Sequence, residues 1–166
     1  VGPRDAAAVA LPPSVSVAVI PNGVDTERLQ PAAANRVPTP PLILFHGNLA
    51  YVDNADCVRF LATVLGPWLQ RRLGPNAFEI RVIGGGADDR LRRTVGGLPW
   101  LKLAGYVDDL AAELRAGTVY AAPLAMGGGI KNKVLEAMAC GLPIVGTREA
   151  FEAIEIQPGT EAVQTA

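Results

Sequence analysis

Apolar segments alternate with segments of helical periodicity between Leu42 and Gly146, and this alternation constrains the fold more than any other feature of the sequence. Short continuous apolar runs, such as residues 42–46, are typical of strands that are buried on both faces. Repeated strand–helix–strand units form right-handed crossovers and place neighbouring strands parallel. The sequence therefore predicts one α/β domain with a Rossmann-like, doubly wound parallel sheet of about five or six strands.

The expected elements can be assigned to residue ranges. Strands are expected at residues 15–20, 42–46, 78–83, 100–104, 118–122 and 143–146. Helices are expected at residues 54–72, 88–95, 108–115 (with Asp108 as the cap) and 130–140. The proline-containing segment 30–41 is interpreted as a linker.

Composition excludes several classes of function. The formal net charge is −1, so no basic face for binding nucleic acid is expected. No apolar run approaches the roughly 20 residues that a transmembrane helix requires, so no membrane-spanning segment is expected. No spacing of His, Cys and carboxylate residues indicates a metal site, and no metal or cofactor is expected. Cys57 and Cys140 lie in apolar helical contexts and are interpreted as structural thiols.

The segment 127–145 combines a glycine loop, a helix with one carboxylate, and a Gly-Leu-Pro turn before a strand. Free backbone N–H groups at a helix start form an anion site. Glu136 lies about 9 Å along the helix from Ile130, at the usual rise per residue. This spacing suits a nucleoside diphosphate held by its phosphates at the loop and by its ribose at Glu136. An ordinary αβ unit with a glycine turn is the alternative.

Residues 134–145, which read Val-Leu-Glu-Ala-Met-Ala-Cys-Gly-Leu-Pro-Ile-Val, resemble the signature of retaining glycosyltransferases with the GT-B fold. Residues 19–25, Val-Ile-Pro-Asn-Gly-Val-Asp, resemble a second motif of this group 1 (family 4) type, at the start of its C-terminal domain. The resemblance extends over about residues 14–155. It implies that residues 14–166 are the donor-binding half of a GT-B enzyme, cut before a closing C-terminal helix. Residues 1–13 would be a frayed lead-in from a missing N-terminal domain.

The resemblance also implies a donor site. The family's matching glutamate binds the ribose hydroxyls of the donor, which implies this role for Glu136. Lys131 and Lys133 lie in the first turn of the same helix, and Lys133 is expected to contact the diphosphate. The alternative for Lys133 is an i,i+3 pair with Glu136. Together with the loops that follow the strands, the expected donor-binding residues are Gly47, Asn48, Gly84, Gly85, Tyr106, Val107, Gly127, Gly128, Gly129, Ile130, Lys133, Val134 and Glu136.

The sequence departs from the family pattern at two places. Many members carry another glutamate eight positions before the ribose-binding one, where this chain has Gly128. Many also carry an arginine and a lysine after the first strand, where residues 47–54 contain no basic residue. In lacking this basic pair the chain resembles a bacterial subgroup with a Gly-x-x-x-Tyr-x-x-Asn stretch and a Gly-Ile-x-Asn-Lys loop. Lys133 and backbone N–H groups would then bind the negatively charged phosphates. The sequence identifies no catalytic residue.

Three further features leave alternatives open. His46, at the end of a strand, either packs in the core or contacts the donor sugar. Tyr106 either packs over a base or is an ordinary aromatic. Gly84–Gly86 lack the third spaced glycine of a dinucleotide fingerprint.

The function that follows is transfer of a sugar from a nucleotide-sugar to an unknown acceptor, with retention and without a metal. The expected partners are the nucleotide-sugar and the missing N-terminal acceptor-binding domain, and the fragment alone is expected to be inactive. The alternatives are half of a nucleotide-sugar epimerase and a non-catalytic nucleotide-sugar binding module. The expected location is the cytoplasm, with peripheral attachment to the inner membrane as an alternative for the full-length protein.

Overall fold

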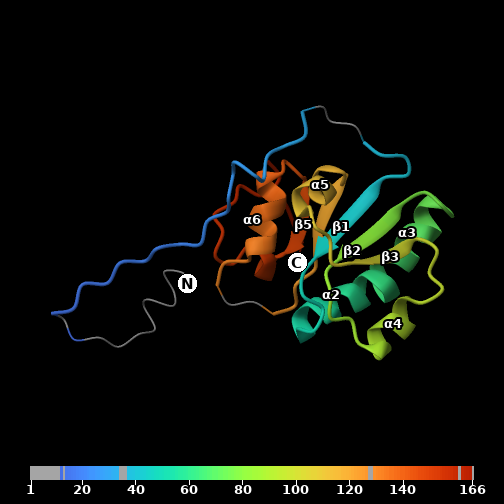
Figure 1. Cartoon of the computed structure of the whole chain (residues 1–166), viewed down its shortest axis with the longest axis horizontal. Helices are drawn as coiled ribbons and strands as arrows, with labels where there is room; N and C mark the ends of the chain where they lie inside the picture. Colours follow the sequence, from blue (N-terminus) through green and yellow to red (C-terminus); the bar gives the residue numbers. More distant parts are fainter. Residues whose placement is uncertain (1–11, 13, 34–36, 127–128, 161, 166) are drawn as a thin grey trace.

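A six-stranded parallel sheet forms the centre of the domain in the computed structural model (Figure 1), which describes residues 12, 14–33, 37–126, 129–160 and 162–165. The sheet order is β3-β2-β1-β4-β5-β6, and each neighbouring pair is parallel. The strands are β1 (Leu42–His46), β2 (Glu79–Ile83), β3 (Leu101–Gly105), β4 (Val119–Ala122), β5 (Ile144–Thr147) and β6 (Val163–Thr165). The predicted doubly wound α/β class is confirmed.

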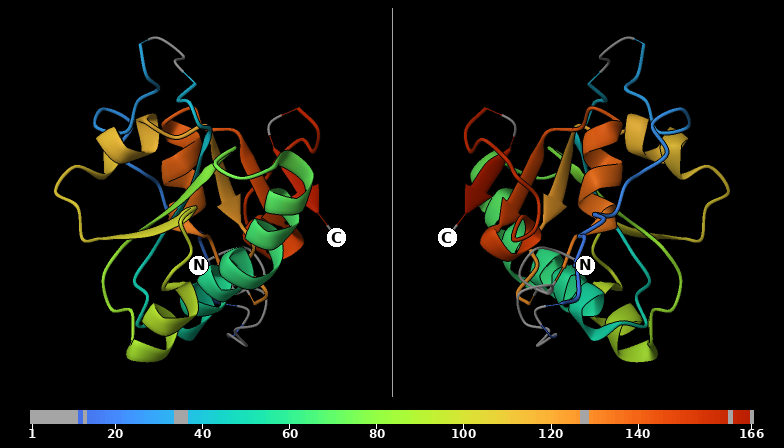
Figure 2. Two further views of the ribbon diagram at one scale, coloured as in Figure 1. Left: turned by 90° about the vertical axis from the view of Figure 1, so that its right-hand side faces the viewer. Right: turned by 90° about the vertical axis from the view of Figure 1, so that its left-hand side faces the viewer.

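Helices cover both faces of this sheet. The helical elements are α2 (Val52–Phe60), η1 (Leu61–Leu65), α3 (Gly66–Leu73), α4 (Asp89–Val95), α5 (Leu110–Arg115), α6 (Asn132–Ala139) and η2 (Arg148–Ala150). The helices α2 to α4 lie on one face, and α5 and α6 lie on the other (Figures 1 and 2). The strand order reverses between β1 and β4, so the loops after these strands diverge to opposite faces at that point.

The core forms because β1 is apolar on both faces. All five residues of β1 are buried, and Leu44 and Phe45 are completely inaccessible. Val58 and Leu61 pack from the helical layer of α2 and η1, and they are also completely inaccessible. Burial of each such side chain contributes about 1.5–3 kcal/mol. The hydrophobic run that predicted a central strand therefore sits at the centre of the sheet.

The long helix expected at residues 54–72 extends from Val52 to Leu73, with a π-helical segment in its middle. Pro67 has no N–H group to donate within the helix. The π-helical segment ends two residues before it, and the Gly66 N–H donates to Leu61 O across five residues. This wider turn accommodates the missing donor without ending the helix.

Two expectations about the elements are wrong, and one element was missed. Residues 15–20 form no strand, because they lie away from the sheet with Val15, Val17 and Ile20 exposed, and apolar residues form a strand only with a pairing partner. The cap of α5 is Asp109 rather than Asp108, since the Asp109 side chain accepts a 2.9 Å hydrogen bond from the Ala112 N–H. The sixth strand, β6, was not predicted, because its three exposed residues carry no apolar pattern.

The Cys-Gly-Leu-Pro sequence has a specific role at the end of α6. Gly141 has a positive φ of 74°, and its N–H donates to Met138 O at 2.9 Å. The Leu142 N–H donates to Ala137 O at 3.1 Å, which completes a Schellman motif. Glycine is required at this position because a side chain would strain the left-handed backbone. The motif ends α6 and directs the chain into β5.

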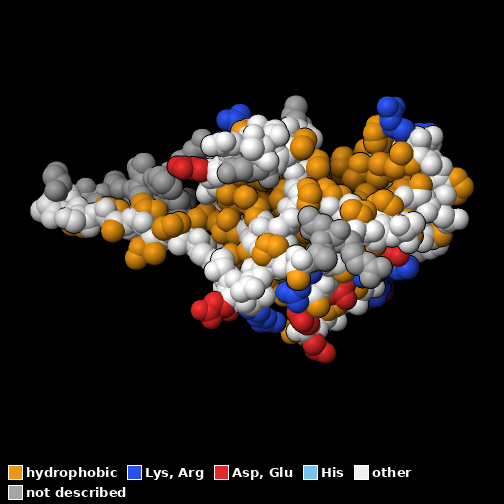
Figure 3. Space-filling view, turned by 90° about the horizontal axis from the view of Figure 1, so that it is seen from above, with side chains coloured by type: hydrophobic (Ala, Val, Ile, Leu, Met, Phe, Trp, Pro, Cys, Tyr) orange, Lys and Arg blue, Asp and Glu red, His pale blue; other side chains and the backbone are white. Residues whose placement is uncertain are grey.

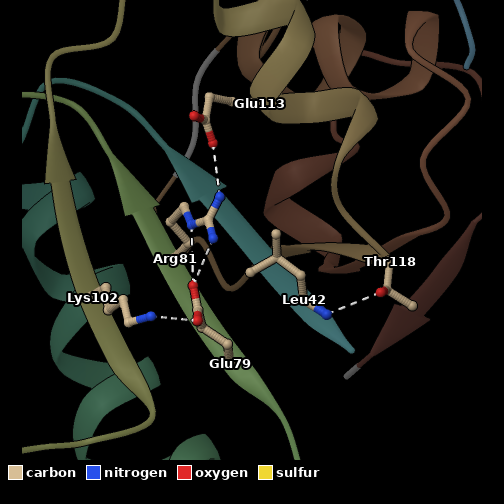
Figure 4. A network of polar contacts seen from close by, with 6 residues as sticks. All are labelled: Leu42, Glu79, Arg81, Lys102, Glu113 and Thr118. Carbon is tan, nitrogen blue, oxygen red and sulfur yellow. Dashed lines mark hydrogen bonds and ion pairs between the residues drawn. The ribbon is translucent and has the colours of Figure 1, made fainter. Parts of the chain in front are cut away.

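A polar network joins β2, β3 and α5 (Figure 4). The Glu79 carboxylate accepts hydrogen bonds from Lys102 at 2.7 Å and from Arg81 at 2.9 Å. Arg81 also donates to Glu113 on α5 at 3.0 Å. Burial opposes ionisation of Glu79, but the bonds from Lys102 and Arg81 outweigh it and keep the pKa of Glu79 below its ordinary value. The network fixes the α5 side of the sheet relative to β2.

Candidate functional site

A cleft of about 480 Å³ opens at the carboxyl ends of β1, β2 and β3. Its floor is formed by the residues where these strands end, and its walls by α5, α6 and an N-terminal segment. The lining residues are Gly23, Val24, Asp25, Arg28, Leu29, His46, Gly47, Ile83, Gly84, Tyr106, Val107, Asp108, Leu110, Ala111, Asn132 and Glu136. This is the edge of a parallel sheet at which ligands bind, next to the reversal of strand order.

Glu136 projects from α6 into this cleft, where it pairs with His46 at the end of β1. The His46 Nε2 atom lies 2.7 Å from Glu136 Oε2. The hydrogen bond from His46 outweighs the opposing effect of burial and lowers the pKa of the Glu136 carboxyl from its ordinary value. Because an ionised carboxylate only accepts hydrogen bonds, Nε2 carries the proton of this contact. The i,i+3 pair of Glu136 with Lys133, which the sequence offered as the alternative, is not the contact that Glu136 makes; its partner is the more distant His46.

His46 is itself held by Tyr120 on β4. The Tyr120 hydroxyl accepts a 3.3 Å hydrogen bond from the His46 backbone N–H, and the two rings meet edge to face at 5.4 Å. Tyr120 is completely buried, and burial raises its pKa above the ordinary range, so the hydroxyl stays protonated. The His46 ring is therefore placed by a neutral, rigid neighbour from the adjacent strand.

Lys133 lies on the side of α6 that faces α2. Its Nζ donates to Asn54 Oδ1 and lies 5.1 Å from the centre of the Phe45 ring. Burial is the main cause that lowers the pKa of Lys133 from its ordinary value. Asn54 in turn donates to Asn48 O at 2.7 Å. A smaller cavity of about 260 Å³ lies here, lined by Tyr51, Val52, Asp53, Asn54, Leu124, Met126, Lys131 and Lys133.

Close backbone approach requires glycine at the rim of the cleft. A Cβ atom at Gly84, where φ is +133°, would lie 2.0 Å from Gly47 O. A Cβ atom at Gly47 would lie 2.8 Å from Asn54 Nδ2. The Gly84 N–H also donates to Gly105 O at 2.7 Å. The loops after β1, β2 and β3 are thus packed backbone against backbone.

An N-terminal segment forms one wall of the cleft. Asn22 donates from Nδ2 to Asn132 Oδ1 at the start of α6, at 2.9 Å. The Asp25 carboxylate accepts from the backbone N–H groups of Glu27 at 3.0 Å and Arg28 at 3.1 Å. Leu29 is buried and anchors the segment on the core. The Pro-Asn-Gly-Val-Asp motif thereby brings Arg28, an exposed cation, to the cleft.

The predicted donor-binding residues divide into three groups. Gly47, Gly84, Tyr106, Val107 and Glu136 line the main cleft, and His46 joins them. Within the described part of the chain, Lys133 lines the smaller cavity, Val134 is buried in the core, and Asn48, Gly85, Gly129 and Ile130 line neither. Gly127 and Gly128 lie outside the described residues.

Sequence reasoning missed Arg28, Asp25, Asn132 and Asp108 in the cleft lining. The motif at residues 19–25 carried a signal for the first two, but only the fold shows that this segment packs against α6. In the same described residues, no three His, Cys, Asp or Glu side chains form a group that could hold a metal ion. None of the described helices has the length and hydropathy needed to span a bilayer.

Both cysteines are buried free thiols, as the sequence predicted. Burial raises the pKa of Cys57 to about 11, and its Sγ–H donates to Pro123 O at 3.3 Å. Neither feature is typical of a reactive nucleophile.

The fold and the position of the cleft define the class of protein, which is a Rossmann-like α/β domain with a ligand site at the carboxyl edge of its sheet. The model of the family described as glycosyl transferases group 1 matches residues 40–164. The chain belongs to the glycosyl transferases group 1 family.

Relatives and solved structures agree with this assignment. Over 72 residues, the chain is 36% identical to a phosphatidyl-myo-inositol mannosyltransferase of Mycobacterium leprae, which covers 42% of the chain and 19% of the relative. TarM superposes with a TM-score of 0.68 at 15% identity, covering 87% of this chain and 28% of TarM. The C-terminal domain of the group 1 glycosyl transferase LpcC from Francisella tularensis superposes at 0.59 and 16% identity, covering 86% and 80%. Anabaena Alr3699/HepE, solved with UDP and glucose, superposes at 0.62 and 16% identity, covering 87% and 41%. The chain thus spans less than half the length of most of these proteins.

Proposed function

We propose that this domain binds the nucleotide-sugar donor of a glycosyltransferase, which transfers the sugar to an acceptor with retention of configuration. The proposal rests on the Glu136 carboxylate, which lies in the cleft at the carboxyl edge of β1, β2 and β3. The hydrogen bond from His46 keeps the pKa of this carboxylate below its ordinary value. A carboxylate that stays ionised makes strong charge-assisted hydrogen bonds to a pair of ribose hydroxyls. Anabaena HepE has been solved with UDP-glucose, which supports this ligand class.

In this proposal the donor lies along the main cleft. The ribose lies on Glu136, and the base lies toward Tyr106 and Val107 at the end of β3. Tyr106 is 84% exposed, so its ring is available for stacking on a base. The diphosphate then runs toward the start of α6, where the helix dipole favours an anion.

The charge of the leaving diphosphate is met by cations of this chain rather than by a metal. Lys133 lies one turn before Glu136 on the same helix, and Arg28 lines the main cleft. Stretch 47–54, where the family's basic pair would stand, instead contributes Asn54 as the partner of Lys133. On the face that Figure 3 shows, Lys and Arg side chains are scattered, several of them next to Asp and Glu, and form no continuous basic field.

Calorimetric titration with UDP, GDP and ADP, and then with their sugar conjugates, tests the proposal. We expect micromolar to millimolar binding of one nucleoside diphosphate, and its loss in Glu136→Ala. Absence of binding by every one of these nucleotides would refute the assignment.

A non-catalytic nucleotide-sugar binding module is the second candidate, because Lys133 is already engaged by Asn54. Full-length protein that binds a nucleotide-sugar but neither transfers its sugar nor releases nucleotide would support the module. Transfer to an acceptor supports the glycosyltransferase. Release of free nucleotide without an acceptor would instead indicate an epimerase-like activity.

A further inference from the structure

The buried side chain of His46 destabilises the fold in a way that an apolar side chain at the same position would not. The residue is 7% exposed, and among the described residues its Nδ1 atom is buried without a hydrogen-bond partner. A buried polar atom without a partner is destabilising, whereas an apolar side chain of similar size is not. Within the part of the chain that the structure describes, the one hydrogen bond of the His46 ring goes to Glu136, across 90 residues of sequence. The bond to Glu136 is therefore what this buried imidazole provides.

The contact leaves Glu136 able to receive a ligand. His46 approaches only Oε2, and the Glu136 side chain keeps 29% of its surface exposed, in the cleft. The backbone and ring of His46 are fixed by Tyr120, so the imidazole is a rigid support. A glutamate has three rotatable side-chain bonds, and fixing it before the ligand arrives removes an entropic cost of binding.

We propose that His46 is a positioning residue for donor recognition: its hydrogen bond to Oε2 fixes the Glu136 carboxylate in the orientation that receives the ribose hydroxyls. This inference rests on the proposed function of the cleft. His46 acts through Glu136, so its effect depends on the presence of those hydroxyls.

The contact between His46 and Glu136 is also expected to set the lowest pH at which the donor binds. The hydrogen bond from His46 is the first cause that keeps the pKa of Glu136 low, and burial acts in the opposite direction. Without His46, burial raises the pKa of Glu136, so the carboxylate takes up a proton at higher pH. Titratable or charged groups on the elements around Glu136 are His46 on β1, Tyr120 on β4, Lys133 and Cys140 beside it on α6, and Arg28, Asp25 and Asp108 along the cleft.

The test compares His46→Leu and His46→Gln with the wild-type chain. The ligands are whichever of UDP, GDP and ADP the wild type binds most tightly, and the 2′,3′-dideoxy form of the same nucleotide. Gln can donate to Glu136 from its amide, whereas Leu cannot. We expect His46→Leu to weaken binding of the ribonucleotide roughly tenfold, the size of one charge-assisted hydrogen bond. Binding of the dideoxy nucleotide should be unchanged, and His46→Gln should recover most of the loss.

The pH profile gives a readout that a structural role would not change. In His46→Leu, affinity for the ribonucleotide should begin to fall at a higher pH than in the wild type as the solution is acidified. If His46→Leu does not fold, His46→Phe, which keeps a planar ring without a donor, replaces it. Since the sequence contains a single histidine, long-range ¹H–¹⁵N NMR reports its Nε2 proton without ambiguity.

Two outcomes would overturn the inference. Equal losses for the ribonucleotide and the dideoxy nucleotide would show that His46 supports the cleft as a whole. No loss for either would show that Glu136 needs no support. Failure of the wild type to bind any of the three nucleotides is a different result, because it removes the proposed function itself.

Discussion

Gly84 and Gly47 approach each other so closely that a methyl group on Gly84 would lie 2.0 Å from the carbonyl oxygen of Gly47. The clash is with backbone, and the φ of +133° at Gly84 is unfavourable for any other residue. We expect Gly84→Ala to destabilise the domain by about 1–3 kcal/mol, the usual cost of overpacking. Urea unfolding measures this change, and binding of nucleoside diphosphate should weaken with it.

Gly85→Ala is the matched control. A Cβ atom at Gly85 would meet nothing within 4 Å. The change should alter the free energy of unfolding by less than about 0.5 kcal/mol. Equal destabilisation of the two variants would contradict the importance of the contact with Gly47.

Glu136→Ala should lower the affinity for a nucleoside diphosphate by roughly 1–3 kcal/mol, because it removes charge-assisted hydrogen bonds to the ribose. Calorimetric titration provides the measurement. Glu155→Ala, at an exposed position after η2, is the control and should leave the affinity unchanged. An unchanged affinity in Glu136→Ala would place the ribose elsewhere.

Lys133→Ala should weaken binding of a nucleoside diphosphate but leave binding of the nucleoside unchanged, because the cation acts on the phosphates. In the full-length enzyme, kcat should fall more than KM rises, since charge on the leaving group grows toward the transition state. Lys131→Ala should do less, because Lys131 precedes the first helical turn as the N-cap residue. Greater sensitivity at Lys131 would reverse the assignment.

The His46–Glu136 contact should also make stability depend on pH. The pKa of Glu136 in the folded chain lies below its ordinary value of 4.5. The stabilisation is therefore present above pH 4.5 and is lost as the pH falls through the lower pKa of the folded state. Urea unfolding of the wild type and of Glu136→Gln should differ at neutral pH and converge in acid. A difference that grows on acidification would contradict the sign of this effect.

The sheet could be predicted from the sequence because its determinants are local. The apolar run at residues 42–46 is buried as β1, and Gly141 ends α6 where the Gly-Leu-Pro turn was expected. Residues 15–20 carry a similar local signal but have no strand to pair with. Local sequence therefore predicted strand character but not strand pairing.

The candidate site could be predicted only in part. Glu136 was identified from its spacing in the helix and from the motif at residues 134–145, and the glycines after β1 and β2 because they follow strands of a doubly wound sheet. The contact between Glu136 and His46 depends on α6 crossing above the end of β1, which joins residues 90 positions apart. Arg28 reaches the cleft through packing of a segment without regular structure. Neither arrangement has a local signature in the sequence.

The wall formed by Gly23 to Leu29 has a consequence for any exchange of this domain between homologous proteins. A recombination boundary in the proline-containing segment before β1 would transfer every strand and every helix intact. It would nevertheless separate Arg28 and Asp25 from the cleft that they line, and Asn22 from its partner on α6. A chimera joined upstream of Asn22 keeps the nucleotide cleft whole, whereas one joined at the start of the sheet inherits a complete fold with a cleft open on one side.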